Sequence, residues 1–504
     1  MRFLLVLALG TSLIPAATAE TYVVQPDGSG DYPTIQAAID HAGWGDVIEL
    51  ADGTFTGDGN RDLNYQGKPI TVRSQSGNPE ACVIDCQASE TDCHRGVDFT
   101  WGEGPGSILE GVTITNGYVE LVNQYPEGLG GGVRVLGPNC TPTIHDVILL
   151  ENLAWVGAGL GIDQASPIVT ECTFRRNDAW WGGGGAVWAR DCDSEFTGCT
   201  FIENNGYQVG GAVDCAYGTF GFSDCRFEGN TVNHGYGAGV SLWWDVVAEI
   251  DGCTFLNNGP AEWGGGLSVM TDSEATVRSC TFSGNEAIYS GGGIHVEHNG
   301  CSAVIENSII AFSPQGDAVG CTQEGDVTLS CCDLFGNAGG DWTGCISTQL
   351  GQAGNIELDP RFCDAAGGDL GLLPESPCAP FSEPNPECDL IGAWPVGCMG
   401  QHVPESITLG DGRLHLSAMP NPFLQATQVS FLVPGQVEDP VTLHVLDAAG
   451  RQIRTLVTHA SQPGSNRITW DGTDRTGEPV AAGVYLVRLS QGENSVSRRV
   501  VLVK

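Results

Sequence analysis

Apolar and polar positions repeat through the middle of the chain with a period of about 27 residues. A Gly-Gly-Gly-like run followed by one apolar residue returns at spacings of 27, 27, 26, 27, 27 and 27, and the apolar residues are Val133, Leu160, Val187, Val213, Val240, Leu267 and Ile294. Triplets such as Val240-Ser241-Leu242 alternate apolar and small polar residues, which is typical of a strand with one buried face. A short unit repeated at a fixed period predicts a stacked solenoid.

A second phrase, Cys-(Thr/Arg)-Phe-x-x-Asn, keeps the same period. Its members are Cys172, Cys199, Cys225, Cys253 and Cys280, then Phe174, Phe201, Phe227, Phe255 and Phe282, then Asn177, Asn204, Asn230, Asn258 and Asn285. We expect a parallel β-helix with turns about 4.8 Å apart. In it the apolar and Phe series form the core, and the asparagines hydrogen-bond along the stack. The glycines occupy a corner that needs positive φ or close backbone approach. The cysteines form a column of buried thiols, because aligned Cβ atoms lie too far apart for disulfides.

The repeat extends beyond its clearest copies. Residues 70–72, 82–84 and 112–114 resemble early turns, and residues 332–337 resemble a degenerate late turn. Before them, Asp31 as N-cap, Pro33 as first helical residue and Ile39 on the apolar side predict a short helix. We expect this helix to end near Gly43 and to cap the N-terminal end of the stack, whose strand edges are otherwise open.

The start of the chain predicts export. Arg2, an apolar run over residues 3–14 and Ala17-Thr18-Ala19 fit a signal peptide that is cleaved between Ala19 and Glu20. No later stretch is long and apolar enough for a membrane-spanning helix. The 20 cysteines suit an oxidising compartment, and we expect disulfides near the end of the repeats. The candidates are Cys363, Cys378, Cys388 and Cys398.

Charge divides the chain into two parts. Residues 20–413 hold 12 Lys/Arg against 54 Asp/Glu, a net charge of −42, whereas residues 414–504 hold 8 against 7. The acidic part disfavours nucleic acid and anionic membranes and favours cations, with Ca²⁺ as a candidate ligand. We expect no other cofactor. The predicted organisation is a signal peptide (1–19), a parallel β-helix (20–400), a linker (401–413) and a small β-sandwich (414–504).

Two resemblances concern the repeats and their start. Gly-Gly-Ala-Val at residues 184–187 and 210–213, with the Phe-x-x-Asn phrases, resembles polymorphic outer membrane protein repeats and right-handed parallel β-helix proteins. This resemblance implies an exported, surface-displayed stalk or adhesin. Asp27-Gly-Ser-Gly-Asp31-Tyr32-Pro-Thr-Ile35 resembles the opening of pectin methylesterases and pectate-lyase-like folds. The catalytic phrases of the esterases do not occur, and residues 98–102 are the nearest approach to one of them.

The last ninety residues resemble flagellar hook-capping-type Ig-like modules and type IX secretion sorting domains. The matching motifs are residues 420–423, 447–451, 454–456, 470–472, 483–485 and 499–504. Short alternating strands between Gly and Pro turns independently predict a β-sandwich. The resemblance implies that this domain engages an export machinery and attaches the protein to the outer membrane surface.

An aromatic series is the best signal for a ligand. One ring precedes each glycine run at spacings of 26, 26, 29, 27 and 26, in the order Trp155, Trp181, Tyr207, Tyr236, Trp263 and Tyr289. We expect these rings at a corner beside Asp163, Asp191, Asp214 and Asp272. If they are exposed, they can stack on sugars while the acids bind hydroxyl groups or Ca²⁺; if they are buried, they are packing residues.

Signals for chemistry are weaker. Lys68 and Lys504 are the only lysines, so a lysine base is disfavoured, and no pattern selects an arginine base among Arg134, Arg175, Arg176, Arg190 and Arg278. A hydrolytic pair among Asp191, Asp193 and Asp214 is conceivable on adjacent turns. His295, Glu297 and His298 invite a metal hypothesis, but on a strand His298 points away from the other two, so we expect a packed or surface histidine.

These observations predict an all-β protein: a right-handed parallel β-helix with an N-terminal capping helix, followed by an Ig-like β-sandwich. The predicted function is binding of an extracellular polysaccharide or surface ligand without catalysis, in a secreted, outer-membrane-associated protein. Two alternatives stay open, an extracellular polysaccharide lyase or glycoside hydrolase, and a purely structural adhesin or stalk.

Overall fold

The computed structural model divides the chain into two compact units, residues 1–401 and 402–504. It describes residues 19–119, 126–297, 300–322, 325–398, 415–419, 427–433, 441–447, 451–457, 464–476, 479–481, 483–491 and 494–502. The predicted signal segment before Ala19, the predicted linker at 401–413, His298 and the motif at residues 420–423 lie outside these ranges. Among the described residues, no helix is long and apolar enough to cross a bilayer.

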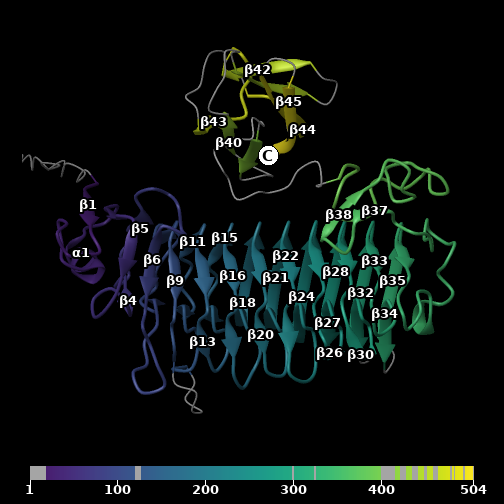
Figure 1. Cartoon of the computed structure of the whole chain (residues 1–504), viewed down its shortest axis with the longest axis horizontal. Helices are drawn as coiled ribbons and strands as arrows, with labels where there is room; N and C mark the ends of the chain where they lie inside the picture. Colours follow the sequence, from purple (N-terminus) through teal and green to yellow (C-terminus); the bar gives the residue numbers. More distant parts are fainter. Residues whose placement is uncertain are drawn as a thin grey trace, which may run out of the picture. The chain divides into compact units, whose positions relative to one another are not determined.

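The first unit is a parallel β-solenoid of about 11 turns (Figure 1). Its described residues include a 19-stranded sheet that contributes two limbs to most turns. Its strands are β1 (Thr21–Val24), β2 (Val47–Leu50), β4 (Leu63–Asn64), β5 (Thr71–Ser74), β7 (Val97–Phe99), β8 (Ile108–Glu110), β10 (Val133–Leu136), β11 (Thr143–His145), β14 (Leu160–Asp163), β15 (Ile168–Thr170), β18 (Val187–Thr197), β21 (Val213–Ser223), β24 (Val240–Asp251), β27 (Leu267–Met270), β28 (Glu274–Arg278), β31 (Ile294–Glu297), β32 (Ser302–Glu306), β34 (Val319–Thr322) and β35 (Asp326–Ser330).

A second parallel sheet supplies the next limb of each turn. Its described strands are β3 (Gly53–Phe55), β6 (Cys82–Asp85), β9 (Thr113–Thr115), β12 (Ile148–Leu150), β16 (Thr173–Arg175), β19 (Thr200–Ile202), β22 (Arg226–Glu228), β25 (Thr254–Leu256), β29 (Thr281–Ser283), β33 (Ile309–Ala311) and β36 (Asp333–Phe335). A fourth, shorter limb comprises β13 (Leu153–Ala154), β17 (Asp178–Ala179), β20 (Asn205–Gly206), β23 (Thr231–Val232), β26 (Ala261–Trp263) and β30 (Ala287–Ser290).

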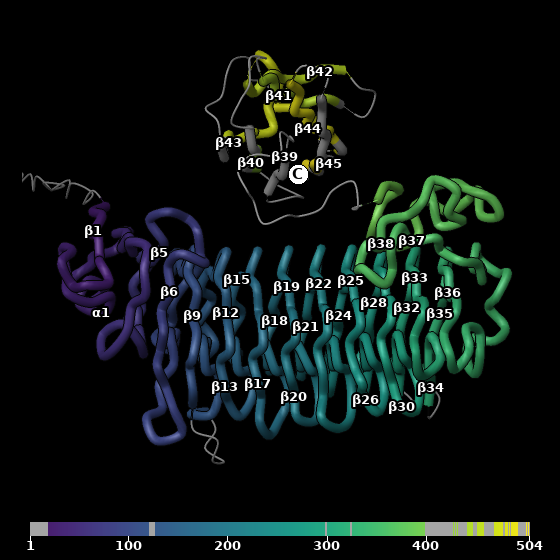
Figure 2. Tube along the Cα trace, viewed as in Figure 1, coloured from purple at the N-terminus to yellow at the C-terminus, as the bar shows by residue number. Residues whose placement is uncertain are grey.

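The backbone register confirms that residues one period apart lie over one another. The pairing runs through Val133, Leu160, Val187, Val213, Val240, Leu267 and Ile294 in order. The turns follow one another along the solenoid in the Cα trace (Figure 2). The predicted Phe series pairs in the same way, and its successive rings stack with centroids 4.3–4.8 Å apart. All five Phe side chains are buried. Repetition of one apolar residue per turn therefore builds a continuous core along the solenoid.

The glycine runs form the corner that leads into the first limb. Gly210 has φ +58°, and an added Cβ would meet the carbonyl of Val213. At Gly211, an added Cβ would meet the carbonyl oxygen of Ala238 on the next turn. These two positions show both predicted reasons for glycine, a left-handed backbone and close approach of neighbouring turns.

Buried asparagines form a ladder at the corner before the fourth limb. In each step, the backbone N–H and the side-chain Nδ2 of one Asn both donate to the Oδ1 of the next, at 2.9–3.1 Å. The Asn ladder consists of Asn152, Asn177, Asn204, Asn230, Asn258 and Asn285. It satisfies polar groups that the fold removes from water.

The repeated cysteines are buried and are not in disulfides, as predicted. Each thiol donates to a backbone carbonyl; Cys253 Sγ lies 3.3 Å from the Phe222 oxygen. Burial raises the pKa of the Cys199, Cys225 and Cys253 thiols well above the ordinary value. These thiols therefore act as small apolar side chains in the core.

The N-terminal helix differs in detail from the prediction. Helix α1 spans Ile35–His41, and the Thr34 hydroxyl accepts from the Ala37 N–H as its N-cap. The cap is thus Thr34 rather than Asp31, and Pro33 precedes the helix instead of starting it. Asp31 instead accepts a hydrogen bond from the Val23 N–H at 2.8 Å, which ties it to β1. Ile35, Ala38 and Ile39 pack into the solenoid core; the capping role of α1 stays a prediction.

Residues 356–398 fold back over the outer face of the second sheet. Leu370 and Leu372 pack with Ile309 of β33, and the Trp394 ring nitrogen donates to the Thr254 hydroxyl at 2.9 Å. This return segment contains β37 (Phe362–Asp364) and β38 (Asp369–Leu372), and a short 3₁₀ helix, Gly344–Ile346, precedes it. Apolar contacts therefore hold the end of the first unit against its own turns.

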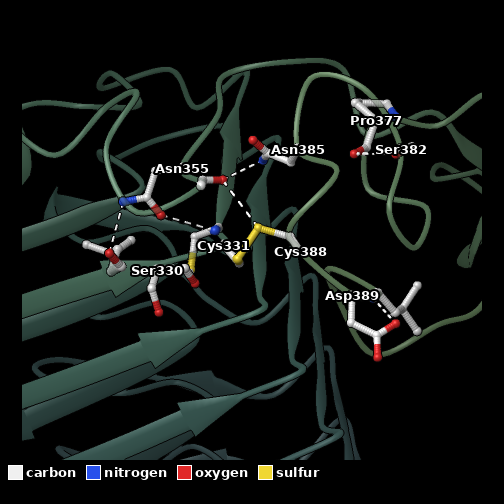
Figure 3. The surroundings of a disulfide bond; sticks show 12 residues. Ser330, Cys331, Asn355, Pro377, Ser382, Asn385, Cys388 and Asp389 are labelled. Carbon is white, nitrogen blue, oxygen red and sulfur yellow. Dashed lines mark hydrogen bonds between the residues drawn. A yellow bond between two sulfur atoms is a disulfide. The ribbon is translucent and has the colours of Figure 1, made fainter.

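Three disulfides tie down this end of the first unit. They join Cys321 to Cys345, Cys331 to Cys388 and Cys363 to Cys398. Figure 3 shows the Cys331–Cys388 bond beside Asn355 and Asn385. Of the four candidate cysteines, Cys363 pairs with Cys398, Cys388 pairs with Cys331, and Cys378 is reduced. The Cys378 thiol donates to the Asp333 carboxyl at 3.0 Å.

The second unit contains two antiparallel sheets. One pairs β39 (His415–Met419), β40 (Thr427–Val433) and β43 (Gly464–Trp470), and the other pairs β42 (Gln452–Val457), β41 (Val441–Asp447), β44 (Gly483–Gln491) and β45 (Asn494–Leu502). Trp470, Val445 and Val487 lie in a separate apolar core. The all-β class and the terminal Ig-like sandwich are as predicted.

Candidate functional site

The predicted ring series lies on or just after the fourth limb, but it does not form one column. Trp181 and Tyr207 stack with centroids 5.8 Å apart and planes 6° apart. A second group starts with Tyr236 stacked on Trp263 at 4.9 Å, and Tyr289 lies 4.9 Å from Trp263 with the two planes tilted by 41°. The series therefore contains two separate stacks, which we name the early stack (Trp181 and Tyr207) and the late stack (Tyr236, Trp263 and Tyr289).

Backbone register explains the break between the stacks. Tyr236 pairs with Val209 on the preceding turn, so Tyr207 lies two residues too early to meet it. The spacing of 29 residues between the two tyrosines, against 26 or 27 elsewhere, is the signal of this offset. A similar shift occurs at the start, where Ala154 pairs with Ala179 and thereby places Trp180, not Trp181, one turn after the half-buried Trp155.

Ring exposure is greatest at the outer ends of the stacks. Trp181 is 54% exposed and Tyr289 is 64% exposed, while Tyr207, Tyr236 and Trp263 are half-buried. Stacking covers the faces of an inner ring, so only its edge can meet a ligand, whereas a terminal ring keeps one face open. Trp180, next to the early stack, adds a further ring that is 56% exposed.

The four predicted acids do not line this series together. Asp163 and Asp214 are buried on the outer side of the first limb. Asp191 and Asp272 are exposed, with φ of 51° and 61°, at the corner that follows that limb. Asp191 and Asp272 therefore do not share the corner of the rings, contrary to the expectation, whereas the Asp214 carboxylate lies beside Gly183 in the glycine run that follows Trp181. The reason is that the extended residues of the first limb separate the corner of the rings from the next corner. Sequence spacing alone does not show which acidic residues of a turn lie on the limb and which lie at the next corner.

Asp214 has an unusual environment. It is 5% exposed, and its Oδ1 has no hydrogen-bond partner among the described residues. Burial raises the pKa of this carboxyl to about 7, although the neighbouring Ser241 hydroxyl lowers it in part. In the register, Asp214 stands between Trp188 and Ser241, and Ser268 and His295 follow. Asp214, Ser241, Ser268 and His295 therefore form a row of polar side chains along the first limb, and glycines of the preceding loops lie against this row.

Two carboxylates border the late stack. Burial, the charge of Glu297 and its hydrogen bond raise the pKa of the Tyr236 hydroxyl to about 12, and Glu262 contributes to the same shift. His295 is fully buried, 6.4 Å from the Trp263 ring, and its Nε2 lies 3.3 Å from the Thr322 hydroxyl. His295 is therefore a packed histidine, as expected. Glu262 and Glu297 were not among the predicted ligand-binding residues.

The residues considered for catalysis each interact with a different partner. Arg134 pairs with Asp98 at 2.7 Å and Arg190 with Asp191 at 3.1 Å. Arg176 and Arg278 pair with Glu151 and Glu306. Asp193 accepts from the Thr219 N–H at 3.0 Å, while Asp214 is buried, so the Asp191, Asp193 and Asp214 carboxylates have three different surroundings. Among the described residues, no group of three or more His, Cys, Asp or Glu side chains is arranged to hold a metal ion.

A second aromatic cluster was not predicted. Arg190, Tyr217, Trp243 and Trp244, which we name the corner shelf, come from three successive turns in β18, β21 and β24. The Tyr217 and Trp244 rings stack at 5.7 Å, the Trp243 and Trp244 rings at 4.4 Å, and the Arg190 guanidinium lies 5.8 Å from the Tyr217 ring centre. Tyr217 and Trp244 are 27 residues apart, which equals the period of the repeat, and this spacing could have predicted their contact from the sequence.

Two family models match parts of this chain. The family model described as right handed beta helix region matches residues 214–355, and the model described as FlgD Ig-like domain matches residues 421–495. No curated protein matches the chain. A solved structure titled "The complex structure of XylC with xylose" aligns with a TM-score of 0.31 and 9% identity, over 89% of this chain and 100% of that chain. The chain thus contains a right-handed β-helix region and a C-terminal FlgD Ig-like domain.

Proposed function

We propose that this is an exported, surface-attached protein whose β-helix binds an extracellular polysaccharide without transforming it. The observation that carries the proposal is the pair of ring stacks on the fourth limb. Their terminal rings, Trp181 and Tyr289, are more than half exposed, at 54% and 64%. Flat aromatic faces at intervals of a few turns suit a polymer of sugar rings, whose apolar C–H faces pack on them while hydroxyl groups reach neighbouring carboxylates.

Charge narrows the class of polysaccharide. Residues 20–413 carry a net charge of −42, and arginines of the β-helix such as Arg176 and Arg190 are paired with acids. A field of this sign raises the free energy of binding an anionic polymer. The proposal therefore favours neutral or amine-bearing polysaccharides over polyuronates.

Affinity electrophoresis of the full chain tests this proposal. The gels contain hydroxyethyl cellulose, galactomannan, laminarin, glycol chitosan or polygalacturonate. We expect at least one of the first four to retard the protein, and Trp181→Ala or Tyr289→Ala to reduce the retardation. Trp44→Ala is the matched control, because Trp44 is 80% exposed and lies between α1 and β2. Retardation by none of the polymers, or equal retardation of all variants, contradicts the proposal.

A product assay separates binding from catalysis. The same polymers are incubated with the protein, and new reducing ends and unsaturated products are measured. The proposal expects neither. Release of either product that Asp214→Asn abolished would instead establish a hydrolase or a lyase.

For the second unit, we propose surface attachment through a sorting role of residues 414–504. The FlgD Ig-like match supports the domain type, and the near balance of 8 Lys/Arg and 7 Asp/Glu sets it apart from the acidic β-helix. Expression of the full chain and of a chain ending at residue 413, in a bacterium with type IX secretion, tests this role. We expect only the full chain on the cell surface, and equal display of both contradicts it.

A further inference from the structure

The corner shelf differs from the ring stacks in its place on the turn. The stacks precede the first limb, whereas Tyr217 and Trp244 follow it, at the corner where the long strands bend. Trp243 lies within the limb and is half-buried, while Trp244 is 40% exposed. The two ring surfaces are therefore separated along each turn by the first limb, and a ligand on one does not occupy the other.

The backbone at the corner shelf is strained. Tyr217 has φ 54° and Trp244 has φ 64°, in the left-handed region that large L-residues rarely adopt. A left-handed conformation costs roughly 1–2 kcal/mol per residue. The corresponding corner of an earlier turn uses Gly137, with φ 106°. Gln164, Asp191 and Thr271 also have positive φ at this corner, so the left-handed bend belongs to the solenoid. Tyr217 and Trp244 are distinguished by carrying bulky aromatic side chains there.

The polar groups around the shelf complete a mixed surface. Asp191 is exposed and forms an ion pair with Arg190 at 3.1 Å. Asp245 follows Trp244 directly and is exposed. Carboxylates that accept hydrogen bonds, a guanidinium that donates them and an indole that is 40% exposed thus occur within three turns. Because Arg190 is neutralised by Asp191, the shelf has no net positive charge that would attract phosphate.

We infer that the corner shelf is a second sugar-binding surface, which takes one pyranose ring against Trp244 while Asp191, Asp245 and Arg190 bind its hydroxyl groups. The inference rests on the proposed function, because it assigns a further subsite for the same polysaccharide. The acidic surroundings disfavour a nucleotide base with its phosphates, and the exposed carboxylates disfavour a purely apolar peptide side chain. A pyranose ring suits this surface, because its apolar face can pack on the aromatic side chains while its hydroxyl groups bond to the charged side chains.

Two subsites on one rigid solenoid have a consequence for chain length. A polymer long enough to reach both surfaces gains an intramolecular second contact, so it binds more tightly than an oligosaccharide that fills one surface. Loss of a central tryptophan anchor from such a surface typically weakens binding roughly 5- to 30-fold. We expect this weakening for the polymer when the shelf is removed, with the ring stacks intact.

The test uses the full chain with Trp244→Asn, which removes the ring but tolerates left-handed backbone better than alanine. Trp181→Ala reports on the early stack, and Trp44→Ala is the control. Dissociation constants for hydroxyethyl cellulose, galactomannan, laminarin and glycol chitosan are measured with each protein. We expect Trp244→Asn to weaken binding roughly 5- to 30-fold, with an unchanged thermal midpoint as evidence that the fold is intact.

The outcomes separate the inference from the proposed function. If Trp181→Ala weakens binding and Trp244→Asn binds like the wild type, the inference is wrong and the proposed function stands. If both variants weaken binding, both are supported. If only Trp244→Asn does so, the shelf is supported as the main surface. Absence of binding to all four polymers by the wild-type chain overturns both. Should Trp244→Asn lower the thermal midpoint, Asp245→Asn replaces it, with weaker binding expected and unchanged binding counting against the inference.

Discussion

Asn204 and Asn230 lie one turn apart, and the Oδ1 of Asn230 accepts two hydrogen bonds from Asn204. The backbone N–H and the side-chain Nδ2 of Asn204 both donate at 3.0 Å. Asn204 Nδ2 also donates to the Phe174 carbonyl at 2.9 Å, and its own Oδ1 accepts from Asn177. Each ladder residue thus bridges the turns on either side of it, in a site without access to water.

Replacement of Asn204 by leucine should destabilise the solenoid strongly. The change removes the acceptor of the Asn177 backbone N–H and Nδ2, and the Nδ2 donor to Asn230 Oδ1 and the Phe174 carbonyl, while the backbone N–H of residue 204 can still donate to Asn230. Each buried group left unsatisfied costs roughly 1–3 kcal/mol. We expect a loss of several kcal/mol, measured as a lower midpoint of urea unfolding followed by circular dichroism. Asn233→Ala, at an exposed asparagine, is the control and should change little. An unchanged midpoint for Asn204→Leu would show that the ladder contributes nothing.

Asp214 should make the protein less stable as pH rises. Its folded pKa is about 7 against an ordinary 3.8, so the carboxyl ionises in the unfolded chain before it does so in the folded one. The free energy of unfolding therefore falls between about pH 4 and 7. A shift of this size corresponds to an effect on the order of 4 kcal/mol. Asp214→Asn removes this contribution, so the variant should be more stable than the wild type at pH 8.

Urea midpoints at pH 4.5 and pH 8 check this expectation. The difference between variant and wild type should be larger at pH 8, while Asp326→Asn, at an exposed carboxyl, should follow the wild type at both values. Burial also raises the pKa values of Glu171 and Asp333 to about 7. The stability of the Asp214→Asn variant should therefore still depend on pH, but less than that of the wild type. A wild type that is equally stable at both pH values would contradict the assignment.

The buried thiol column should resist alkylation in the native state. Cys172, Cys199 and Cys225 are almost completely buried and their thiol pKa values are raised, so both reagent access and the thiolate fraction are low. Iodoacetamide followed by peptide mass spectrometry should label Cys93, which is exposed and not in a disulfide, but not the column. In denaturant all of them should react. Native labelling of Cys199 at the rate of Cys93 would show that the turns open readily.

The Cys331–Cys388 disulfide should hold the return segment against the second sheet. It closes a loop with a sequence separation of 57 residues, for which loop-closure entropy predicts about 4 kcal/mol. With both cysteines changed to alanine, limited proteolysis should cut within residues 377–395 much faster than in the wild type. Cys378→Ala is the matched control, because Cys378 is buried in the same cluster without a disulfide. Equal cleavage of the double variant and the wild type would assign the stability to apolar packing alone.

Much of the β-helix follows from the period alone. In a parallel stack, residues one period apart occupy equivalent places on neighbouring turns, so the spacing of Val213 and Val240 specifies a direct backbone pairing. The same logic predicted the Phe227–Phe255 stack and the Asn ladder, because identical side chains above one another can share one kind of contact. Local turn residues likewise predicted an antiparallel sandwich at the C-terminus, which the sheets around Trp470 confirm.

The ligand-facing surfaces needed the tertiary structure. Loop length varies by two or three residues between turns, and this variation moved Tyr207 out of line with Tyr236 and placed Val209 there instead. Whether an acid is buried like Asp214 or exposed like Asp191 depends on which loops fold over the limb, and these contacts do not repeat.

The sequence by itself determined the stacked core and its register, since period and side-chain type are one-dimensional properties that a parallel stack converts directly into contacts. Only the tertiary structure decided that Trp244 of the corner shelf is exposed and that the return segment contacts Thr254 through Trp394. The physical reason is that exposure and the contacts of the return segment depend on which non-equivalent segments cover a turn, and the repeat does not specify these.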